Sequence, residues 1–260
     1  MRTNDIVVIK YGGSLLDDRA HRMAFLKDIA SLPKSPRVIL VHGGGKEISR
    51  QMEKAGLTPR FVNGRRFTDE ATLVVVEAAL KELNGEMVQA LHKLGVRTKG
   101  YSGRDRHLME ATPVAELGRV GVPSDVKSTV LQTMLDDATI PIFYSIAEDT
   151  HGLPLNVNAD EMALALATSL HAARLIYLTD TGGLLGRDGA VLTKVDEFLI
   201  KELINDGTIK DGMRVKVEAC LEALRRGVGC VDLAKDVKFL KTKLGLSTGT
   251  TIALRKAAKV

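Results

Sequence analysis

The sequence predicts an α/β protein, namely a three-layer α/β/α sandwich with a mainly parallel central sheet and two lobes. Short runs of β-branched residues alternate with helical patterns, which is typical of parallel strands covered by helices. With 260 residues, 45% of them hydrophobic, the chain can bury the core of one large domain or of two coupled lobes. No internal repeat, low-complexity tract or linker rich in Pro, Gly and Ser separates the lobes, so we expect a tight boundary near residue 170.

The expected strands are the apolar runs richest in β-branched residues. They are IVVIK at 6–10, RVILVH at 37–42, IPIFYSI at 140–146, ARLIYLTD at 173–180 and GVGCVDLA at 227–234. The expected helices are segments whose apolar residues recur at helical spacing. They are HRMAFLKDIASL at 21–32, KEISRQMEKAG at 46–56, the segment 69–95, ADEMALALATSLHA at 159–172 and KDGMRVKVEACLEALRRG at 210–227. The segment 69–95 is long enough for two helices joined near Asn84 and Gly85.

Composition argues against a membrane protein and against a secreted one. The strongest apolar segments, such as ATLVVVEAAL, are short and lie between charged residues, so none approaches the roughly 18 apolar residues that span a bilayer. The N-terminal MRTNDIVVIK enters a strand pattern at once and has no apolar core followed by a cleavage site. Cys220 and Cys230 have neither CxxC spacing nor nearby histidines, so we interpret them as reduced structural thiols. We therefore expect a cytoplasmic protein.

The basic net charge does not by itself indicate a nucleic-acid partner. The formal net charge is +5 and the isoelectric point is about 9.1, but basic and acidic residues are interleaved except in the segment 235–259. Four Tyr, six Phe and no Trp leave little for base stacking. We interpret the basic segment as a solvated surface rather than a nucleic-acid patch.

Glycine-rich turns follow the first two expected strands. Lys10 ends the first strand and precedes Tyr11, Gly12, Gly13 and Ser14, at the edge where open α/β sheets bind ligands. The second strand runs into residues 43–45, all glycine, before a helix that begins near residue 46, so backbone N–H groups there could face an anion. Each turn alone is a weak signal, because tight turns use glycine for conformational reasons. Neither turn fits a Walker loop or a GxGxxG fingerprint.

The segment FVNGRRFTDE places two arginines after a turn and before a helix that Thr68 or Asp69 caps. An arginine at this place could hold a substrate carboxylate through two parallel hydrogen bonds. The alternative is a surface arginine bridged to Asp69 or Glu70, and we favour that alternative for Arg65. Arg66 is the functional candidate.

The segment LNVNADEMALALA combines an extended stretch with the beginning of a helix. Alternation along the stretch puts Asn156 and Asn158 on one face, where two amides could bind an amide or a carboxylate. Asp160 lies at the start of the helix, and an ordinary helix cap is a strong alternative to a functional role for it. Both roles stay open for Asp160.

The fourth expected strand leads into Thr181, Gly182, Gly183 and Leu184. The last expected helix begins near Gly212, and Gly227 ends it. Lys216 falls in its first turns and, considered alone, is an ordinary lysine on a helix surface.

Taken together and in this order, these features resemble the amino acid kinase family, and acetylglutamate kinases most closely. The resemblance spans nearly the whole chain. It rests on IKYGGS, VHGGGKEI, NGRRFTDE, GYSGRDRHL, NVNADEMA, LTDTGGLL, DGMRVKV with EACLEAL, and STGTTI. It implies an amino acid kinase-like fold in one domain over residues 1–260. Within it, an N-lobe of about 1–170 would bind the acyl amino acid and dimerise, and a C-lobe of about 171–260 would bind ATP.

The resemblance also implies roles for individual residues. Lys10 and Lys216 would stabilise the transferring phosphoryl group, and Asp160 would orient both lysines. The implied substrate contacts are Gly44, Gly45, Arg66, Asn156 and Asn158. The implied phosphate contacts are Gly12 and Gly13. The implied nucleotide contacts are Asp180, Gly182, Gly183, Leu184, Ile209, Lys210, Gly212 and Met213.

The implied reaction is ATP-dependent phosphorylation of the γ-carboxylate of N-acetyl-L-glutamate, a step of arginine biosynthesis. A γ-carboxylate with an ordinary pKa of about 4.3 is already ionised at neutral pH, so the reaction needs no general base. It needs positioning and positive charge, which two lysines and glycine-rich turns can provide. We therefore expect no catalytic histidine, a structural His42, and no metal site made by the protein. Mg²⁺ would arrive with ATP and be held mainly by phosphates.

Several positions depart from the pattern of acetylglutamate kinases. VDLAKDVKFLKTKLGL replaces an Asp-Gly-Arg-like turn and a leucine-rich helix, and Ser14 is more typical of aspartokinases or isopentenyl phosphate kinases. Arg106 stands where glycine is usual, and Ser145 where proline is frequent. The alternatives are a kinase of an acylated aminoadipate or of isopentenyl phosphate, or a non-catalytic ligand-binding member. Because a strand begins near residue 6, the long N-terminal helix of arginine-inhibited hexamers is absent, and we expect an arginine-insensitive homodimer.

Overall fold

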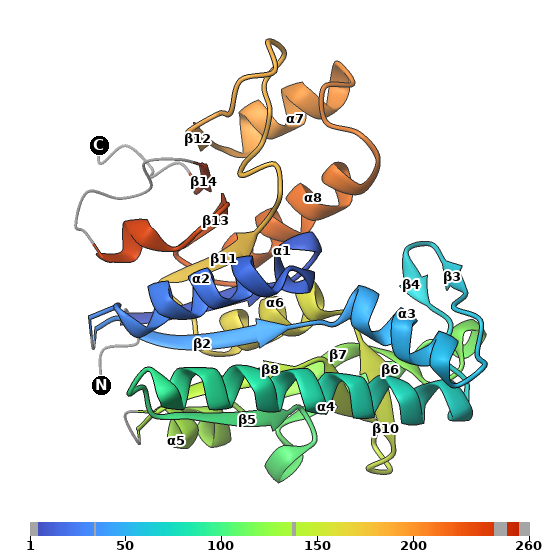
Figure 1. The fold of residues 1–260 in the computed structure, drawn as a ribbon. Helices are drawn as coiled ribbons and strands as arrows, with labels where there is room; N and C mark the ends of the chain where they lie inside the picture. Colours follow the sequence, from blue (N-terminus) through green and yellow to red (C-terminus); the bar gives the residue numbers. More distant parts are fainter. Residues whose placement is uncertain (1–4, 34, 137–138, 242–248, 255–260) are drawn as a thin grey trace.

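A central eight-stranded sheet organises the protein (Figure 1). The structure, a computed structural model, describes residues 5–33, 35–136, 139–241 and 249–254. In this part of the chain the strand order is β12-β14-β13-β11-β1-β2-β8-β5. Every pair of neighbours is parallel except β13 and β14. The bounds are β1 (Ile6–Tyr11), β2 (Arg37–His42), β5 (Thr98–Ser102), β8 (Ile140–Tyr144), β11 (Arg174–Leu178), β12 (Lys194–Val195), β13 (Cys230–Ala234) and β14 (Thr250–Ile252).

Helices cover both faces of this sheet. Their bounds are α1 (Ser14–Asp17), α2 (Arg19–Ala30), α3 (Gly45–Lys54), α4 (Glu70–Lys93), α5 (Ser128–Asp136), α6 (Ala159–Ser169), α7 (Glu197–Asn205) and α8 (Asp211–Arg225). Side chains alternate along β1, so Val7 and Ile9 pack with α2 and α4 while Ile6 and Val8 pack with α5, α6 and α8. The three-layer sandwich with a mainly parallel sheet is therefore confirmed. No helix in the described residues is both long enough and apolar enough to cross a membrane.

Shorter strands form two further units. β6 (Met109–Pro113), β7 (Val120–Val126), β9 (Ile146–Glu148) and β10 (Pro154–Val157) close into a small barrel. β3 (Phe61–Val62) and β4 (Arg65–Arg66) form a hairpin. The hairpin turn consists of Asn63 and Gly64, which both have positive φ, as a two-residue turn between antiparallel strands requires.

Two expectations about these elements are wrong. The run 140–146 is not one strand, because the chain leaves the central sheet after Tyr144 and enters the barrel at Ile146. The segment 69–95 holds a single helix, α4, with no joint near Asn84 and Gly85. The Asn84 amide is buried and donates to the Ile142 carbonyl at 2.9 Å, so a residue that usually interrupts helices is here hydrogen-bonded to the sheet.

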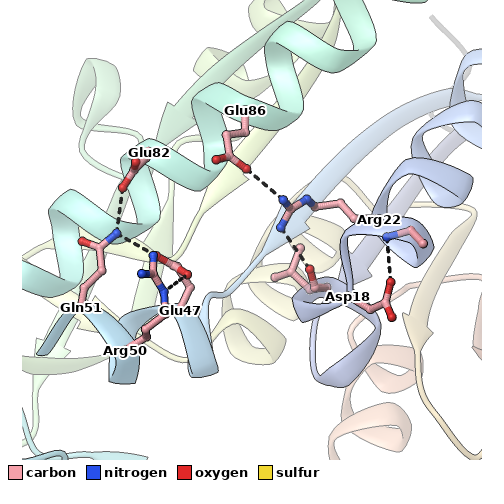
Figure 2. Close-up of polar contacts among 9 residues, drawn as sticks. Asp18, Arg22, Glu47, Arg50, Gln51, Glu82 and Glu86 are labelled. Carbon is pink, nitrogen blue, oxygen red and sulfur yellow. Dashed lines mark hydrogen bonds and ion pairs between the residues drawn. The ribbon is translucent and has the colours of Figure 1, made fainter. Parts of the chain in front are cut away.

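A network of polar contacts fastens α2 and α3 to α4 (Figure 2). Arg22 on α2 donates to Glu86 on α4 at 2.9 Å. Gln51 on α3 donates to Glu82 on α4 at 2.8 Å and to Glu47 on its own helix at 2.9 Å. These contacts, together with apolar packing between α3 and α4, fix the position of the glycine turn that precedes α3.

His42, at the end of β2, is fully buried, as expected of a structural histidine. Its Nδ1 lies 2.8 Å from the Gly43 carbonyl and its Nε2 lies 3.0 Å from the Asn84 amide nitrogen. Burial lowers the pKa of His42 to about 4. The imidazole is therefore neutral at pH 7 and acts as a hydrogen-bonding part of the core.

Candidate active site

The predicted turns lie together at one edge of the central sheet. β1 lies between β2 and β11, and in this parallel arrangement Lys10 pairs in register with Val41 and Tyr177. The turns that follow the three strands, at residues 11–13, 43–45 and 179–184, therefore share the carboxyl edge of the sheet. The turns that the sequence singles out are thus neighbours in the fold, and a ligand site at this edge stays a prediction.

Lys10, Asp160 and Lys216 form a cluster at this edge. The Lys10 Nζ lies 2.8 Å from Asp160 Oδ1, and the Lys216 Nζ lies 3.8 Å from Asp160 Oδ2. The three residues come from β1, α6 and α8. Tyr177 contacts two members of the cluster. Its hydroxyl donates to the Asp160 carbonyl at 3.2 Å, and its ring centroid lies 5.9 Å from the Lys216 Nζ.

The charges of this cluster sum to one positive charge. Burial raises the pKa of Asp160, but the two lysines together outweigh it and hold that pKa below its usual value. The carboxylate is thus ionised at neutral pH and faces two ammonium groups. The side chains of Lys10, Asp160 and Lys216 are 15%, 33% and 27% exposed, so a ligand can reach them. Such a cluster can attract and orient a phosphate group.

Gly12 gives the Lys10 side chain its room. A Cβ added at Gly12 would lie 2.7 Å from the Lys10 Nζ, closer than any real contact of this kind. Gly13, the next residue, has φ +68°, in the left-handed region that favours glycine. The two glycines therefore have different roles. Gly12 leaves space for the Lys10 side chain, and Gly13 adopts the left-handed conformation that leads the chain into α1.

The second glycine turn ends at the beginning of α3. Gly44 is the N-cap of α3 and no side chain caps the helix, so its first N–H groups are available to an anion. A Cβ at Gly44 would lie 3.1 Å from the Leu80 side chain, and one at Gly43 would lie 3.4 Å from the Ala159 Cβ. The turn thus abuts the start of α6, one residue before Asp160.

Arg66 is a buried cation without a carboxylate partner among the described residues. Its side chain lies under the Phe61 ring, and its Nη2 donates to the Gly45 carbonyl and to the Ser49 hydroxyl, each at 3.0 Å. The residue is only 7% exposed, and burial lowers its pKa. A buried charge without a counter-charge is costly, so the position of Arg66 beside the α3 turn favours an anionic ligand there.

Arg65 forms an ion pair, as expected, but the predicted partner is wrong. Arg65 does not bridge to Asp69 or Glu70 but lies 2.5 Å from Glu161 on α6. Asp69 caps α4, and Glu70 pairs with Arg119 at 2.9 Å. β4 points its two arginines in opposite directions, as alternation along a strand requires, so Arg65 meets α6 while Arg66 meets α3.

The two asparagines have different surroundings. Asn158 is the N-cap of α6, because its Oδ1 accepts from the Asp160 backbone N–H at 2.7 Å. The alternative of Asp160 as the cap is therefore wrong, and its carboxylate is available to the lysines. The exposed Asn158 side chain retains its NH₂ group. Asn156, on β10, donates to the Thr68 hydroxyl at 3.1 Å.

The loop after β11 is held by tight packing. Gly182 has φ +71°, and an added Cβ would lie 2.6 Å from the Cγ of Lys235, so the lysine stem crosses this glycine. A Cβ at Gly183 would lie 2.5 Å from the Val191 side chain. Asp180 is exposed, whereas the Leu184 side chain is buried and its N–H donates to the Thr250 hydroxyl at 2.7 Å.

The expected nucleotide residues before and in α8 divide into buried and exposed ones. Ile209 is buried in the same core cluster as Leu184, and Met213 packs against that cluster. Lys210 and Gly212 are exposed at the beginning of the helix that carries Lys216. A ligand could thus contact the exposed residues at the beginning of α8, whereas the side chains of Ile209 and Leu184 are part of the hydrophobic core.

The sequence interpretation missed three residues near this edge. Tyr177 and Glu161 contact the expected site residues, and Lys235 covers Gly182. A signal existed for Lys235, since it directly follows β13, just as Lys10 lies near the carboxyl end of β1. Among the described residues, no group of three or more His, Cys, Asp or Glu side chains has the arrangement that could hold a metal ion.

Known proteins resemble the chain over nearly its whole length. Acetylglutamate kinase of Endomicrobium trichonymphae is 37% identical over 239 residues, which are 92% of this chain and 96% of that relative. Acetylglutamate kinase of Campylobacter curvus (strain 525.92) is 39% identical, over 86% of this chain and 82% of the relative.

Solved structures share the fold. The crystal structure of smu.665 from Streptococcus mutans UA159 has a TM-score of 0.78 and 30% identity, and the match covers 97% of this chain and 99% of that one. Carbamate kinase from Giardia lamblia bound to AMP-PNP has a TM-score of 0.71 at 15% identity, over 98% of this chain and 100% of that one.

A family model agrees with these relatives. The model described as the amino acid kinase family matches residues 5–231, which include Lys10, Asp160 and Lys216. With the fold, the ordered motifs and the relatives in agreement, the chain belongs to the amino acid kinase family.

Proposed function

We propose that this protein transfers the γ-phosphoryl group of ATP to the γ-carboxylate of N-acetyl-L-glutamate, as a step of arginine biosynthesis. The observation that carries this proposal is the Lys10–Asp160–Lys216 cluster at the carboxyl edge of the sheet, with the buried Arg66 nearby in the acceptor half. The relatives named acetylglutamate kinase match 85% or more of the chain at 36–40% identity.

The acceptor half of the proposed site lies around the start of α3. Arg66 would pair with the α-carboxylate of the acylated amino acid, since it is a buried guanidinium that lacks a counter-charge. The N–H groups at Gly44 and Gly45 and the amide of Asn158 would bind the remaining polar groups of the acceptor. Asn156 would act nearby, through its contact with Thr68.

The donor half of the proposed site lies over β11 and the start of α8. Gly12 and Gly13 would contact the transferring phosphate. Asp180, the glycines at 182 and 183, and the exposed Lys210 and Gly212 would contact the nucleotide. Leu184, Ile209 and Met213 would support it from the core, through backbone groups or packing. We assign the acceptor to an N-lobe of about 1–170 and ATP to a C-lobe of about 171–260.

The proposed reaction is an in-line displacement. A γ-carboxylate oxygen of the acceptor attacks the γ-phosphorus, the bond to the β–γ bridging oxygen breaks, and ADP leaves with that electron pair. Lys10 and Lys216 would stabilise the negative charge on the phosphoryl oxygens, and Asp160 would hold the two ammonium groups apart at a fixed spacing. The carboxylate is already ionised, so no proton has to move before attack.

Mg²⁺ would accompany ATP. Asp160, the carboxylate between the lysines, is already paired with both of them, so the phosphate oxygens are left as the main ligands. The metal would neutralise part of the phosphate charge, and Lys10 and Lys216 would orient the transferring phosphoryl group.

We also propose a cytoplasmic homodimer that arginine does not inhibit. Light scattering at several protein concentrations tests the dimer, and assays with added arginine test the regulation. A hexamer, or strong inhibition by arginine, contradicts this part of the proposal and leaves the reaction itself untouched.

An ADP-release assay with a panel of acceptors tests the reaction. N-acetyl-L-glutamate should give the highest kcat/KM, ahead of N-acetyl-aminoadipate, aspartate and isopentenyl phosphate. A preference for aminoadipate or for the phosphate acceptor would reassign the substrate, and no ADP release with any acceptor would favour a non-catalytic ligand-binding protein. Lys10→Ala and Lys216→Ala should lower kcat far more than they raise KM.

A further inference from the structure

The β3–β4 hairpin is held in place by arginines on both of its faces. Arg66 reaches α3 through the Gly45 carbonyl and Ser49. Arg65, the preceding residue, reaches α6 through Glu161. The hairpin thus lies between the two helices whose first turns form the acceptor half of the proposed site.

Apolar packing contributes little to holding the hairpin. Phe61 is 56% exposed and Val62 is 36% exposed, and the turn residues Asn63 and Gly64 are exposed as well. An isolated two-stranded hairpin is at best marginally stable in water. Backbone hydrogen bonds with Leu117 and Arg119 anchor the buried Thr68 just after β4, so the position of β4, and of Arg66 with it, depends on this anchor and on the polar contacts that β4 makes.

The Arg65–Glu161 pair is not an ordinary surface ion pair. Its contact is 2.5 Å, and the side chains are only 27% and 29% exposed. Arg65 Nη1 and Glu161 Oε2, the atoms outside the contact, are also shielded from solvent and make no hydrogen bond. Each charge has lost much of its hydration and has the other as its partner, so removing one leaves the other poorly compensated.

Each partner of the pair is the sequence neighbour of a residue of the proposed site. Arg65 is adjacent in sequence to Arg66, the proposed partner of the acceptor carboxylate. Glu161 is adjacent to Asp160, which holds the two lysines. The two partners are 96 residues apart in the chain, so their contact joins the hairpin that carries Arg66 to the helix that carries Asp160.

We propose that Arg65 and Glu161 are a positioning pair that clamps the β3–β4 hairpin to α6 and so fixes Arg66 against the acceptor. The proposal rests on the proposed function of the site. Neither residue touches the transferring phosphate; both act through Arg66. Loss of the pair therefore affects acceptor binding and leaves nucleotide binding unchanged.

Steady-state kinetics on Arg65→Met, Glu161→Gln, the double variant and Arg65→Lys test the proposal. Each single uncharged variant should raise KM for N-acetyl-L-glutamate about five- to thirtyfold and change KM for ATP and kcat less than twofold. The double variant should have a KM for N-acetyl-L-glutamate no higher than that of the single variant with the larger increase, because it leaves no unpaired charge. Arg65→Lys should recover most of the affinity. Lys241→Met, which breaks a 2.8 Å ion pair with Asp28 elsewhere, is the control and should leave both KM values unchanged.

Amide hydrogen exchange on the protein without substrate separates this proposal from the proposed function. Exchange in residues 60–67 should be at least fivefold faster in Arg65→Met than in wild type and unchanged in Lys241→Met. If wild type does not phosphorylate N-acetyl-L-glutamate, the proposed function fails while the exchange result still decides the clamp. Unchanged exchange in Arg65→Met, or effects of the two single variants that add up in the double variant, would overturn the clamp.

Discussion

Replacing Asp160 by Asn removes the charge that holds the two lysines while keeping the size of the side chain. Asp160 faces the Lys10 Nζ at 2.8 Å and the Lys216 Nζ at 3.8 Å. A charge-assisted hydrogen bond contributes about 1.5–3 kcal/mol, and the longer contact adds less. Because the side chain is one third exposed, solvent screening keeps the total near 2–4 kcal/mol. The lysines would then repel each other and lose their fixed spacing.

The loss should appear in kcat. If the misplaced lysines withhold the same 2–4 kcal/mol from the transition state, kcat decreases roughly 30- to 900-fold. ADP release at saturating ATP and N-acetyl-L-glutamate measures it, and KM for the acceptor should change less than threefold. Asp28→Asn, which alters the partner of Lys241, is the control and should retain wild-type kcat. A kcat of Asp160→Asn within threefold of wild type would refute the reasoning.

Four further outcomes are expected. Arg66→Met should raise KM for the acceptor at least 30-fold without lowering Tm, because it removes an unpaired buried charge; a lower Tm with unchanged KM would count against that role. Gly12→Ala should lower kcat at least tenfold with little change in Tm, since its Cβ would displace the end of Lys10, and wild-type kcat would contradict this. Arg106→Gly should raise the free energy of unfolding in urea by about 0.5–1 kcal/mol, because Arg106 has φ +60°, and destabilisation would show that its side chain matters more. The pKa of His42 is about 4 in the folded protein and 6.5 in its unperturbed state, so only the unfolded chain gains a proton between these values. Stability should thus fall by about 3 kcal/mol as pH falls from 6.5 to 4, and His42→Gln should remove this dependence.

Much of the candidate site could be predicted from the sequence because its residues lie at places that local rules mark. Lys10 ends a strand of β-branched residues, and a glycine turn follows it, which identifies the binding edge of a parallel sheet. Arg66 follows a recognisable Asn-Gly turn. Asp160 follows a strong helix start. These signals need only a few neighbouring residues.

The missed features depend on contacts between distant residues. The pairing of Arg65 with Glu161 bridges 96 residues, whereas sequence spacing offered Asp69 and Glu70 as nearer partners. Asn84, in the middle of the continuous α4, donates to the Ile142 carbonyl across 58 residues. No local propensity encodes either contact, because tertiary packing overrides the usual preference of such residues.

Two strands of the barrel, β6 and β7, were missed for a different reason. β6 and β7 contain Gly, Pro, Glu and Asp, which strands generally avoid, so they lack the apolar runs that mark the central strands. The sequence also gives no sign that β8 and β9 are separated at Ser145, since the residues on both sides of Ser145 are apolar and buried. The hydrophobic pattern therefore predicts one continuous strand, whereas β8 belongs to the central sheet and β9 to the barrel.

Trapping the reaction product with hydroxylamine tests the central claim most directly. The protein is incubated with ATP, Mg²⁺, N-acetyl-L-glutamate and hydroxylamine, and the hydroxamate formed is compared with the ADP released. A carboxylate kinase gives an acyl phosphate, so hydroxamate and ADP should appear in equal amounts, and Lys216→Ala should abolish both together. ADP release without hydroxamate would contradict transfer to the carboxylate.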